Sequence, residues 1–206
     1  MKDNYLMLNG QQITFTPEQI AKITAIMGDG KKKLGELEAG DTFKIGAHEF
    51  FVLEQLCGNG TSVLYKGLLE ENMRFGKNNN YSDEGCVVRK RLEDFAKELE
   101  GIVGAGNLIT HTVDLTSDDG LDDYGMINTK VSLLTCDLYR NYVKVIDKHK
   151  IDKWWWLVTP YSTPTHEDAE WMKCVSPRGN ISNDNCNINY GVRPFCILNS
   201  NIFVSV

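Results

Sequence analysis

Three consecutive tryptophans, Trp154 to Trp156, constrain this chain more than any other feature of its sequence. They open the run W-W-W-L-V-T-P, whose aromatic and β-branched content predicts a strand that stops at Thr159-Pro160. Successive side chains on a strand point to opposite faces, so Trp154 and Trp156 are expected on one face and Trp155 on the other. Because one core cannot take all three rings, at least one indole is expected near a second face or under a loop.

The composition indicates one ordinary globular domain, because 206 residues with 42% hydrophobic and 24% charged side chains can bury a substantial core. The first thirty residues lack an apolar signal-peptide core, and no later stretch reaches membrane-spanning length, which favours a protein that is neither exported nor membrane-bound. The cysteines lie singly and far apart, so reduced thiols in a bacterial cytoplasm are expected: Cys57, Cys86, Cys136, Cys174, Cys186 and Cys196.

Residues 1–30 are predicted to form an N-terminal hairpin and helix, ahead of a main domain over residues 31–206. Asn9-Gly10 is a hairpin signal between two short strands, and Thr16 to Gln19 form a capping box that predicts a helix start. Ile20, Ile23 and Met27 then trace one apolar helix face that Gly28 closes. The stretch from Gly28 to Lys33 is predicted to be a solvated linker.

The main domain reads as an α+β fold of short antiparallel strands with two packed helices. One helix is expected to begin at Ser82-Asp83-Glu84, and a second to run from Thr135 to about Asp147 with Leu138, Tyr142 and Val145 inward. Strands are expected at residues 40–46 and 49–54, turning at Gly46-Ala47, and at residues 61–65, 154–158, 171–175, 190–192, 195–198 and 202–206.

The order of several motifs resembles an uncharacterised bacterial and phage domain family with a C-type-lectin-like fold, of the kind shared with formylglycine-generating enzymes. The motifs that carry the resemblance cover most of residues 36–206: Gly40-Asp41-Thr42-Phe43, Phe51-Val52-Leu53, Phe75-Gly76, Asn79-Asn80-Tyr81-Ser82, Val113-Asp114-Leu115-Thr116, Ser132-Leu133-Leu134-Thr135 with Tyr139-Arg140, W-W-L at Trp155-Trp156-Leu157, and G-V-R-P at Gly191-Val192-Arg193-Pro194.

The resemblance implies that N- and C-terminal strands pair and that long loops project from one side. It implies no activity, because the family has none assigned. Members often carry Arg after W-W-L, where this chain has Val158, so a charged contact at that position is in doubt. Gly191, Arg193 and Pro194 are predicted to be structural, with Arg193 bonded to carbonyls or to an aspartate because a buried unpaired charge is expensive.

The net charge of −6 argues against direct binding of nucleic acid, whose phosphates are held by Lys and Arg. A partner with a basic surface, such as a nucleic-acid-binding protein, is compatible with it. The predicted partner-binding residues are aromatic anchors and the acids of one loop: Trp154, Trp155, Trp156, Trp171, Asp118, Asp119, Asp122 and Asp123.

No cofactor is expected, and the metal candidates are weak. Asn183, Asp184 and Asn185 offer oxygens to calcium, but the Glu-Pro-Asn and Trp-Asn-Asp signatures of calcium-dependent sugar binders are absent. Cys186 and Cys196 are ten residues apart, unlike the close reactive pair of formylglycine-generating enzymes. No zinc motif, phosphate loop or other catalytic signature occurs, so an enzyme is disfavoured.

These observations rank three hypotheses. The first is a non-catalytic, cytoplasmic binding protein of a phage or mobile element that modulates or inhibits a macromolecular partner, for example a host defence nuclease, as anti-CRISPR proteins do. The second is a ligand- or carbohydrate-recognition module of a phage structure. The third is a thiol-dependent oxidase-like enzyme. The oligomeric state is open.

Overall fold

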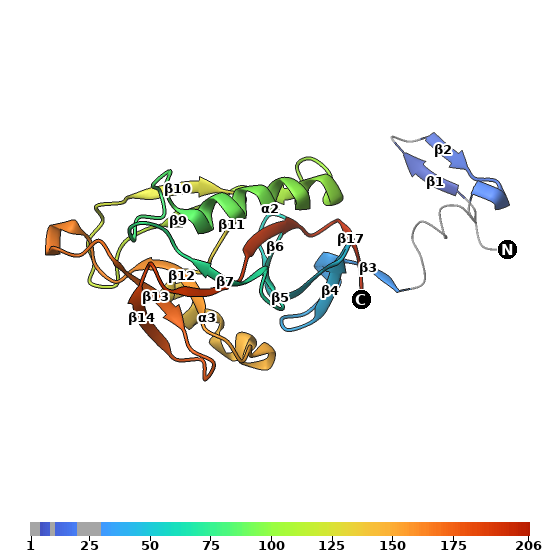
Figure 1. Cartoon of the computed structure of the whole chain (residues 1–206). Helices are drawn as coiled ribbons and strands as arrows, with labels where there is room; N and C mark the ends of the chain where they lie inside the picture. The colour runs from blue at the N-terminus through green and yellow to red at the C-terminus, as the bar shows by residue number, and fades with distance from the viewer. Residues whose placement is uncertain (1–4, 9–10, 20–29) are drawn as a thin grey trace.

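The computed structural model describes residues 5–8, 11–19 and 30–206, which form a mixed α+β fold dominated by antiparallel sheet (Figure 1). The α+β class predicted from the sequence is therefore correct. Across these residues, no helix combines the length and the apolar character needed to cross a membrane.

The N-terminal hairpin is present as predicted, with β1 (Tyr5–Leu8) paired antiparallel to β2 (Gln11–Thr14). The capping box is also formed: the Thr16 N–H donates to Gln19 Oε1 at 2.9 Å, and the Gln19 N–H donates to Thr16 Oγ1 at 3.2 Å. The predicted turn, the helix face and its closing glycine lie outside the described residues: Asn9, Gly10, Ile20, Ile23, Met27 and Gly28.

The larger of two main sheets has the strand order β11-β16-β6-β5-β4-β17-β3, and β8 pairs with β16 beside this path. The hairpin of β4 and β5 turns at Gly46, which has a positive φ of 58°, as the sequence predicts. Its strands are β3 (Lys31–Lys33), β4 (Thr42–Ile45), β5 (His48–Leu56), β6 (Gly60–Tyr65), β8 (Leu108–Ile109), β11 (Val131–Ser132), β16 (Phe195–Asn199) and β17 (Phe203–Ser205).

The second sheet has the order β14-β13-β12-β15-β7, in which only the β12–β15 pair is parallel. Its strands are β7 (Glu70–Arg74), β12 (Trp155–Pro160), β13 (Trp171–Val175), β14 (Ile181–Asn185) and β15 (Asn189–Val192). A separate two-stranded ribbon consists of β9 (His111–Asp114) and β10 (Met126–Thr129).

Two α-helices lie within residues 30–206: α2 (Val87–Val103) and α3 (Cys136–Ile146). Helix α3 begins directly after Thr135, where the sequence predicts a helix start, and Thr135 caps it: its Oγ1 accepts from the Leu138 N–H at 3.1 Å. Three short 3-10 turns complete the elements: η1 (Leu34–Glu36), η2 (Asp147–His149) and η3 (Pro164–His166).

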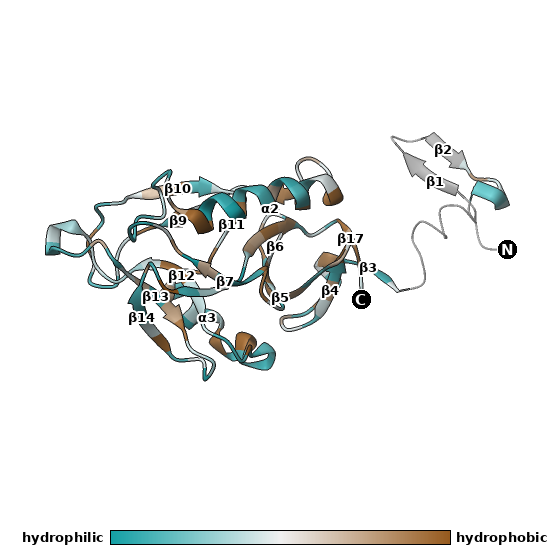
Figure 2. Cartoon of the chain, viewed as in Figure 1, coloured by the Kyte–Doolittle hydropathy of each residue, from teal (hydrophilic) through white to brown (hydrophobic). Residues whose placement is uncertain are grey.

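Both faces of β5 and of β12 are covered, which explains their unbroken apolar runs. In β5, Phe50 faces the core beneath α2, whereas Phe51 faces the core beneath α3. In β12, Trp156 joins the first of these cores and Trp155 the second. Figure 2 shows hydrophobic residues along β5, β6 and β12, and more hydrophilic ones in the loops farthest from the C-terminus.

Several predicted boundaries are wrong. Lys31–Lys33 is an edge strand paired with β17 rather than a linker. Helix α2 starts at Val87, later than predicted, because the Asp83 carboxylate holds the Gly85 N–H in a preceding turn. Strand β12 runs through Pro160 instead of stopping before it: Pro160 lies opposite Met172 of β13, after a register shift between Trp156 and Pro160.

The buried face of α3 is also offset from the predicted one. Cys136, Tyr139 and Ile146 are buried. The three residues predicted to point inward are only partly buried at the edge of that core: Leu138, Tyr142 and Val145.

Candidate functional site

The tryptophans of the W-W-W run divide between the two cores and the surface. Trp155 and Trp156 are buried, so neither ring is available to a partner in this structure. Trp154 is 36% exposed and stacks on Tyr190 with ring centres 5.5 Å apart, and Trp156 packs on the other side of the strand from Trp155, also against Tyr190. Of the three predicted anchors, only Trp154 reaches the surface.

Arg193 is buried between the sheets and is held by carbonyl oxygens rather than by an aspartate. Its Nε donates to the carbonyl of Tyr65 at 2.9 Å, and its Nη2 donates to those of Lys66 at 3.0 Å and His149 at 2.9 Å. The guanidinium also lies 5.3 Å from the ring centres of both Phe51 and Trp155. Burial lowers the pKa of Arg193 to about 9, which still leaves it charged at neutral pH.

Gly191 and Pro194, which flank Arg193 in the G-V-R-P motif, make backbone hydrogen bonds to neighbouring strands. The Gly191 N–H donates to the Trp154 carbonyl at 2.8 Å, and a Cβ at Gly191 would lie only 2.5 Å from Leu68 Cδ1. The Pro194 carbonyl accepts from the Tyr65 N–H at 2.9 Å. This motif therefore joins β15 to β12 and β6, where side chains leave no room for a larger residue.

The acidic loop, residues 115–125, is tied to a second loop, residues 161–170, by its aspartates. Asp119 accepts from Ser117 Oγ at 2.5 Å, from Ser162 Oγ at 2.6 Å, and lies 2.9 Å from His166 Nδ1. The hydrogen bond from Ser117, followed by those from Ser162 and His166, lowers the pKa of Asp119 well below its usual range. Asp119 therefore stays ionised and clamps the two loops together.

Asp118 and Asp123 extend this clamp. Asp123 accepts from Thr163 Oγ1 and Thr165 Oγ1, each at 2.6 Å. Asp118 pairs with Lys173 of β13 at 2.9 Å and with Arg140 of α3 at 3.2 Å. Asp118, Asp119 and Asp123 thus have a positioning role in addition to any contact with a partner, while Asp122 is exposed.

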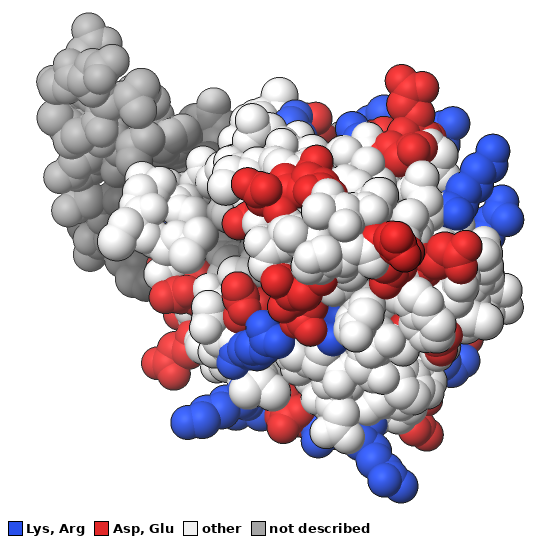
Figure 3. Space-filling model, turned by 90° about the vertical axis from the view of Figure 1, so that its left-hand side faces the viewer, with Lys and Arg blue, Asp and Glu red and all other residues white. Residues whose placement is uncertain are grey.

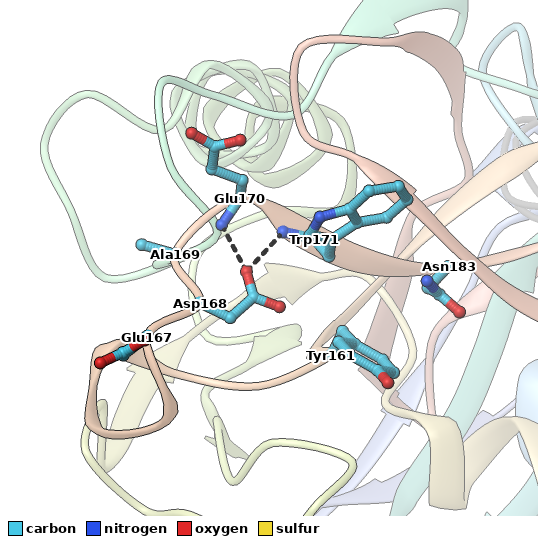
Figure 4. Close-up of a pocket in the computed structure, with 7 residues that line it drawn as sticks. All are labelled: Tyr161, Glu167, Asp168, Ala169, Glu170, Trp171 and Asn183. Atoms are coloured by element: carbon cyan, nitrogen blue, oxygen red, sulfur yellow. Dashed lines mark hydrogen bonds between the residues drawn. The ribbon is translucent and has the colours of Figure 1, made fainter.

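A hollow of about 620 Å³ opens beside these loops, between Tyr161 and the start of β13 (Figure 4). Tyr161 is 44% exposed and Trp171 is 41% exposed, so both rings line the hollow at the surface. Asp168 supports the wall between them by accepting from the Glu170 N–H at 2.9 Å and the Trp171 N–H at 3.3 Å. The other lining residues come from the same loop and from β14: Glu167, Ala169, Glu170 and Asn183.

The surface around this hollow is acidic. The two loops contain seven carboxylates and neither lysine nor arginine. Among the described residues, the only lysine or arginine ion pairs to these seven are those of Asp118 with Lys173 and Arg140. Figure 3 faces this end of the molecule and shows acidic side chains across it, with most basic ones nearer the edges. We call this surface, formed by the hollow and the two loops, the aromatic–acidic face.

The weak calcium candidates lie on a strand rather than in a loop. Because Asn183, Asp184 and Asn185 are consecutive in β14, Asp184 points away from its two neighbours. Asp184 accepts from Tyr190 Oη, and the Asn185 amide donates to Glu170. Within the described part of the chain, no group of three or more His, Cys, Asp or Glu side chains is placed to hold a metal ion.

The cysteines that prompted the oxidase hypothesis are free and buried. Cys186 and Cys196 both belong to the core beneath α2, and burial raises the pKa of each thiol. A buried thiol with a raised pKa is a poor nucleophile, because the thiolate is the reactive form. Their surroundings are those of core residues.

Sequence reasoning missed Tyr161, Glu167, Asp168 and Glu170 as members of the site. A signal was present: two aromatic residues, Tyr161 and Trp171, enclose a loop that carries three acids and no lysine or arginine. Trp171 is predicted as an aromatic anchor by itself, and the prediction does not include the acids of the loop that precedes it.

Comparison with known proteins finds no relative of this chain. No protein-family model matches the chain, and no curated protein or solved structure gives a significant match.

Proposed function

We propose that this chain is a non-catalytic binding protein, carried by a phage or mobile element, that inhibits a partner with a basic surface inside the bacterial cell. The observation that carries the proposal is the aromatic–acidic face, where two exposed rings line an open hollow among carboxylates. A host defence nuclease is the partner we favour, because a protein that binds nucleic acid presents Lys and Arg to the phosphates, and such a basic surface complements the acidic one.

The rings and the carboxylates suit such a partner in different ways. Exposed Trp and Tyr are the residues that most often dominate binding energy at protein interfaces, because they bury large areas at low entropic cost. A lysine or arginine can also lie over an aromatic ring, and the chain already shows this, since Lys173 Nζ lies 5.6 Å from the centre of the Tyr161 ring. The surrounding carboxylates add long-range attraction to a basic surface and repel nucleic acid itself.

The clamp between the two loops supports the same proposal. A binding surface on free loops loses affinity because the loops must be ordered on association. Here Asp119 and Asp123 fix the second loop through hydroxyl groups of Ser162, Thr163 and Thr165. The rings at both ends of this loop are therefore presented in a set position before a partner arrives.

We also propose that the fold is C-type-lectin-like. Two features support it: β3, the first strand of residues 31–206, pairs with the last strand, β17, and long loops emerge together at the opposite end from this pair (Figure 1). In that fold the loops carry the binding function, and strands hold them in place. The aromatic–acidic face lies on such loops.

The test is capture of a partner from lysate of a bacterial host by the immobilised chain, followed by its identification. The expected protein is basic and binds nucleic acid. Capture of this protein should be lost with Trp171→Ala or Glu167→Lys. It should be retained with Phe203→Ala, a matched control that removes another exposed ring, on β17. Purified partner should then lose nuclease or nucleic-acid-binding activity when the chain is added. A partner retained equally by all variants would show that another surface is used.

A carbohydrate ligand is the second candidate, because Tyr161, Trp171 and the Asn183 amide together offer stacking surfaces and a hydrogen-bonding group in one hollow. A glycan array probed with and without EDTA tests it. Glycan binding that Trp171→Ala abolishes would favour this function over inhibition, and loss of binding in EDTA would bring calcium and the Asn183 to Asn185 strand into it.

A further inference from the structure

A second pocket, of about 380 Å³, lies apart from the hollow between β9, β11, β16 and α3. Its volume is within the range of about 300–1,000 Å³ that small-molecule sites occupy. The apolar part of its wall comes from β9, α3, β16 and the residue that follows β11: Val113, Leu138, Phe195, Ile197 and Leu133. None of these residues belongs to the aromatic–acidic face.

A neutral polar pair lies in the pocket wall. His111 Nε2 is 3.0 Å from Ser132 Oγ, and the imidazole packs edge-on against Phe195 with ring centres 5.2 Å apart. Burial lowers the pKa of His111 to about 4, so the ring is uncharged at neutral pH. The interior of the pocket therefore offers apolar contacts and hydrogen bonding without charge.

The mouth of the pocket, in contrast, is acidic. Asp114 and Asp137 line both this pocket and an adjoining polar hollow of about 220 Å³, which also contains Asp118 and Arg140. Arg140 pairs with Asp137 at 2.8 Å and with Asp118 at 3.2 Å, but Asp114 accepts only from Thr116 among the described contacts. No lysine or arginine lines the apolar pocket itself.

We propose that this pocket binds a small amphipathic cation, with an apolar body against Phe195 and Leu138 and a protonated amine at the mouth beside Asp114 and Asp137. Both parts of such a ligand match the pocket. The apolar interior accommodates a ring or short chain, and the carboxylates at the mouth attract a positive charge and repel a negative one. The site uses different residues from the proposed protein interface, so either can hold without the other.

Three probes that share a phenylethyl group separate the contributions: phenethylamine, 2-phenylethanol and 3-phenylpropionate, each titrated into the full chain at pH 7 and followed by NMR. The expected Kd for phenethylamine is about 1 mM, a usual affinity for a ligand of so few atoms. The alcohol should bind about fivefold more weakly, the size of an exposed ion pair, and the carboxylate more weakly still. The His111 ring proton signals should shift on binding, because the ring lines the pocket.

Variants assign the site. Asp114→Asn with Asp137→Asn should remove the preference for the amine over the alcohol, whereas Asp94→Asn should keep it. Asp94 is the matched control because, like Asp137, it forms an i,i+3 ion pair on an exposed helix surface, in this case with Lys97. Leu138→Trp should fill the pocket and abolish binding of every probe, with the melting temperature showing that the variant folds.

Three results would overturn the proposal. One is binding of 3-phenylpropionate as tight as that of phenethylamine. The second is the absence of saturable binding by any probe up to its solubility limit. The third is binding that Leu138→Trp leaves unchanged in a folded protein.

Discussion

Replacing Arg193 with methionine tests how far the two cores depend on one buried cation. The change keeps an unbranched apolar side chain but removes the charge and the donors that reach the carbonyls of Tyr65, Lys66 and His149. It also removes the contacts of the guanidinium with the Phe51 and Trp155 rings. Everything else in the G-V-R-P segment can stay in place.

The magnitude follows from these contacts. Each of the three carbonyls would lose its Arg193 donor at a cost of about 1 kcal/mol, the lower end of the usual range, because Tyr65, Lys66 and His149 are only partly buried. Two lost cation–π contacts add about 0.5–1 kcal/mol each. Methionine does not carry the cost of removing a charged guanidinium from water on folding, and this offsets part of the loss. We expect Arg193→Met to lower the free energy of unfolding by about 3 kcal/mol.

The assay is urea unfolding followed by tryptophan fluorescence, since Trp155 lies against Arg193. Arg178→Met is the matched control: Arg178 is exposed, and a surface change of this kind alters stability by about 0.5 kcal/mol or less. Arg193→Lys should also be destabilising, because one ammonium cannot copy the planar fork that serves three carbonyls. A loss below about 1 kcal/mol for Arg193→Met, with an unchanged m-value, would refute this account of the buried cation.

Three further predictions concern other parts of the fold. The pKa of His111 is about 4 when folded and near 6.5 when unfolded, so the unfolded chain binds more protons between these values; unfolding free energy should fall by about 3 kcal/mol as pH drops from 6.5 to 4, and His111→Gln should flatten this dependence in urea titrations across pH. Asp119→Asn should release the loop at residues 161–170, seen as faster proteolysis and amide exchange there, while Asp122→Asn should leave it protected. Gly191→Ala should cost about 1–3 kcal/mol in the same unfolding assay, because its Cβ would meet Leu68, and Leu68→Ala should recover part of that loss in the double variant.

Local chemistry made several elements predictable from the sequence. Thr135 and Thr16 indicate helix starts because their hydroxyls can accept a hydrogen bond from a free backbone N–H, and both do so. Gly46 marks the β4–β5 turn because a positive φ is needed there. The alternation of Trp154, Trp155 and Trp156 followed from strand geometry alone, although only the structure shows that a second core, rather than a covering loop, takes Trp155.

Elements that depend on distant partners were missed. The sequence of β14 is Ile-Ser-Asn-Asp-Asn, which has little strand preference, yet it pairs along its whole length with β13. The three lysines of β3 likewise become a strand only because β17 lies beside them. In the candidate site, the clamp by Asp119 and the pairing of Tyr161 with Trp171 depend on which loops meet, and no local pattern specifies that.

The placement of β17 between β3 and β4 has a consequence for how the protein folds. The larger sheet cannot close until residues from the two ends of the 30–206 segment have met, so its completion requires a very long chain loop to be ordered. Until then the β4 edge is unpaired and open to strands of other molecules. Refolding yield should therefore fall as protein concentration rises. A peptide spanning β17, supplied in excess, should restore folding of a chain that lacks this strand by pairing in its place.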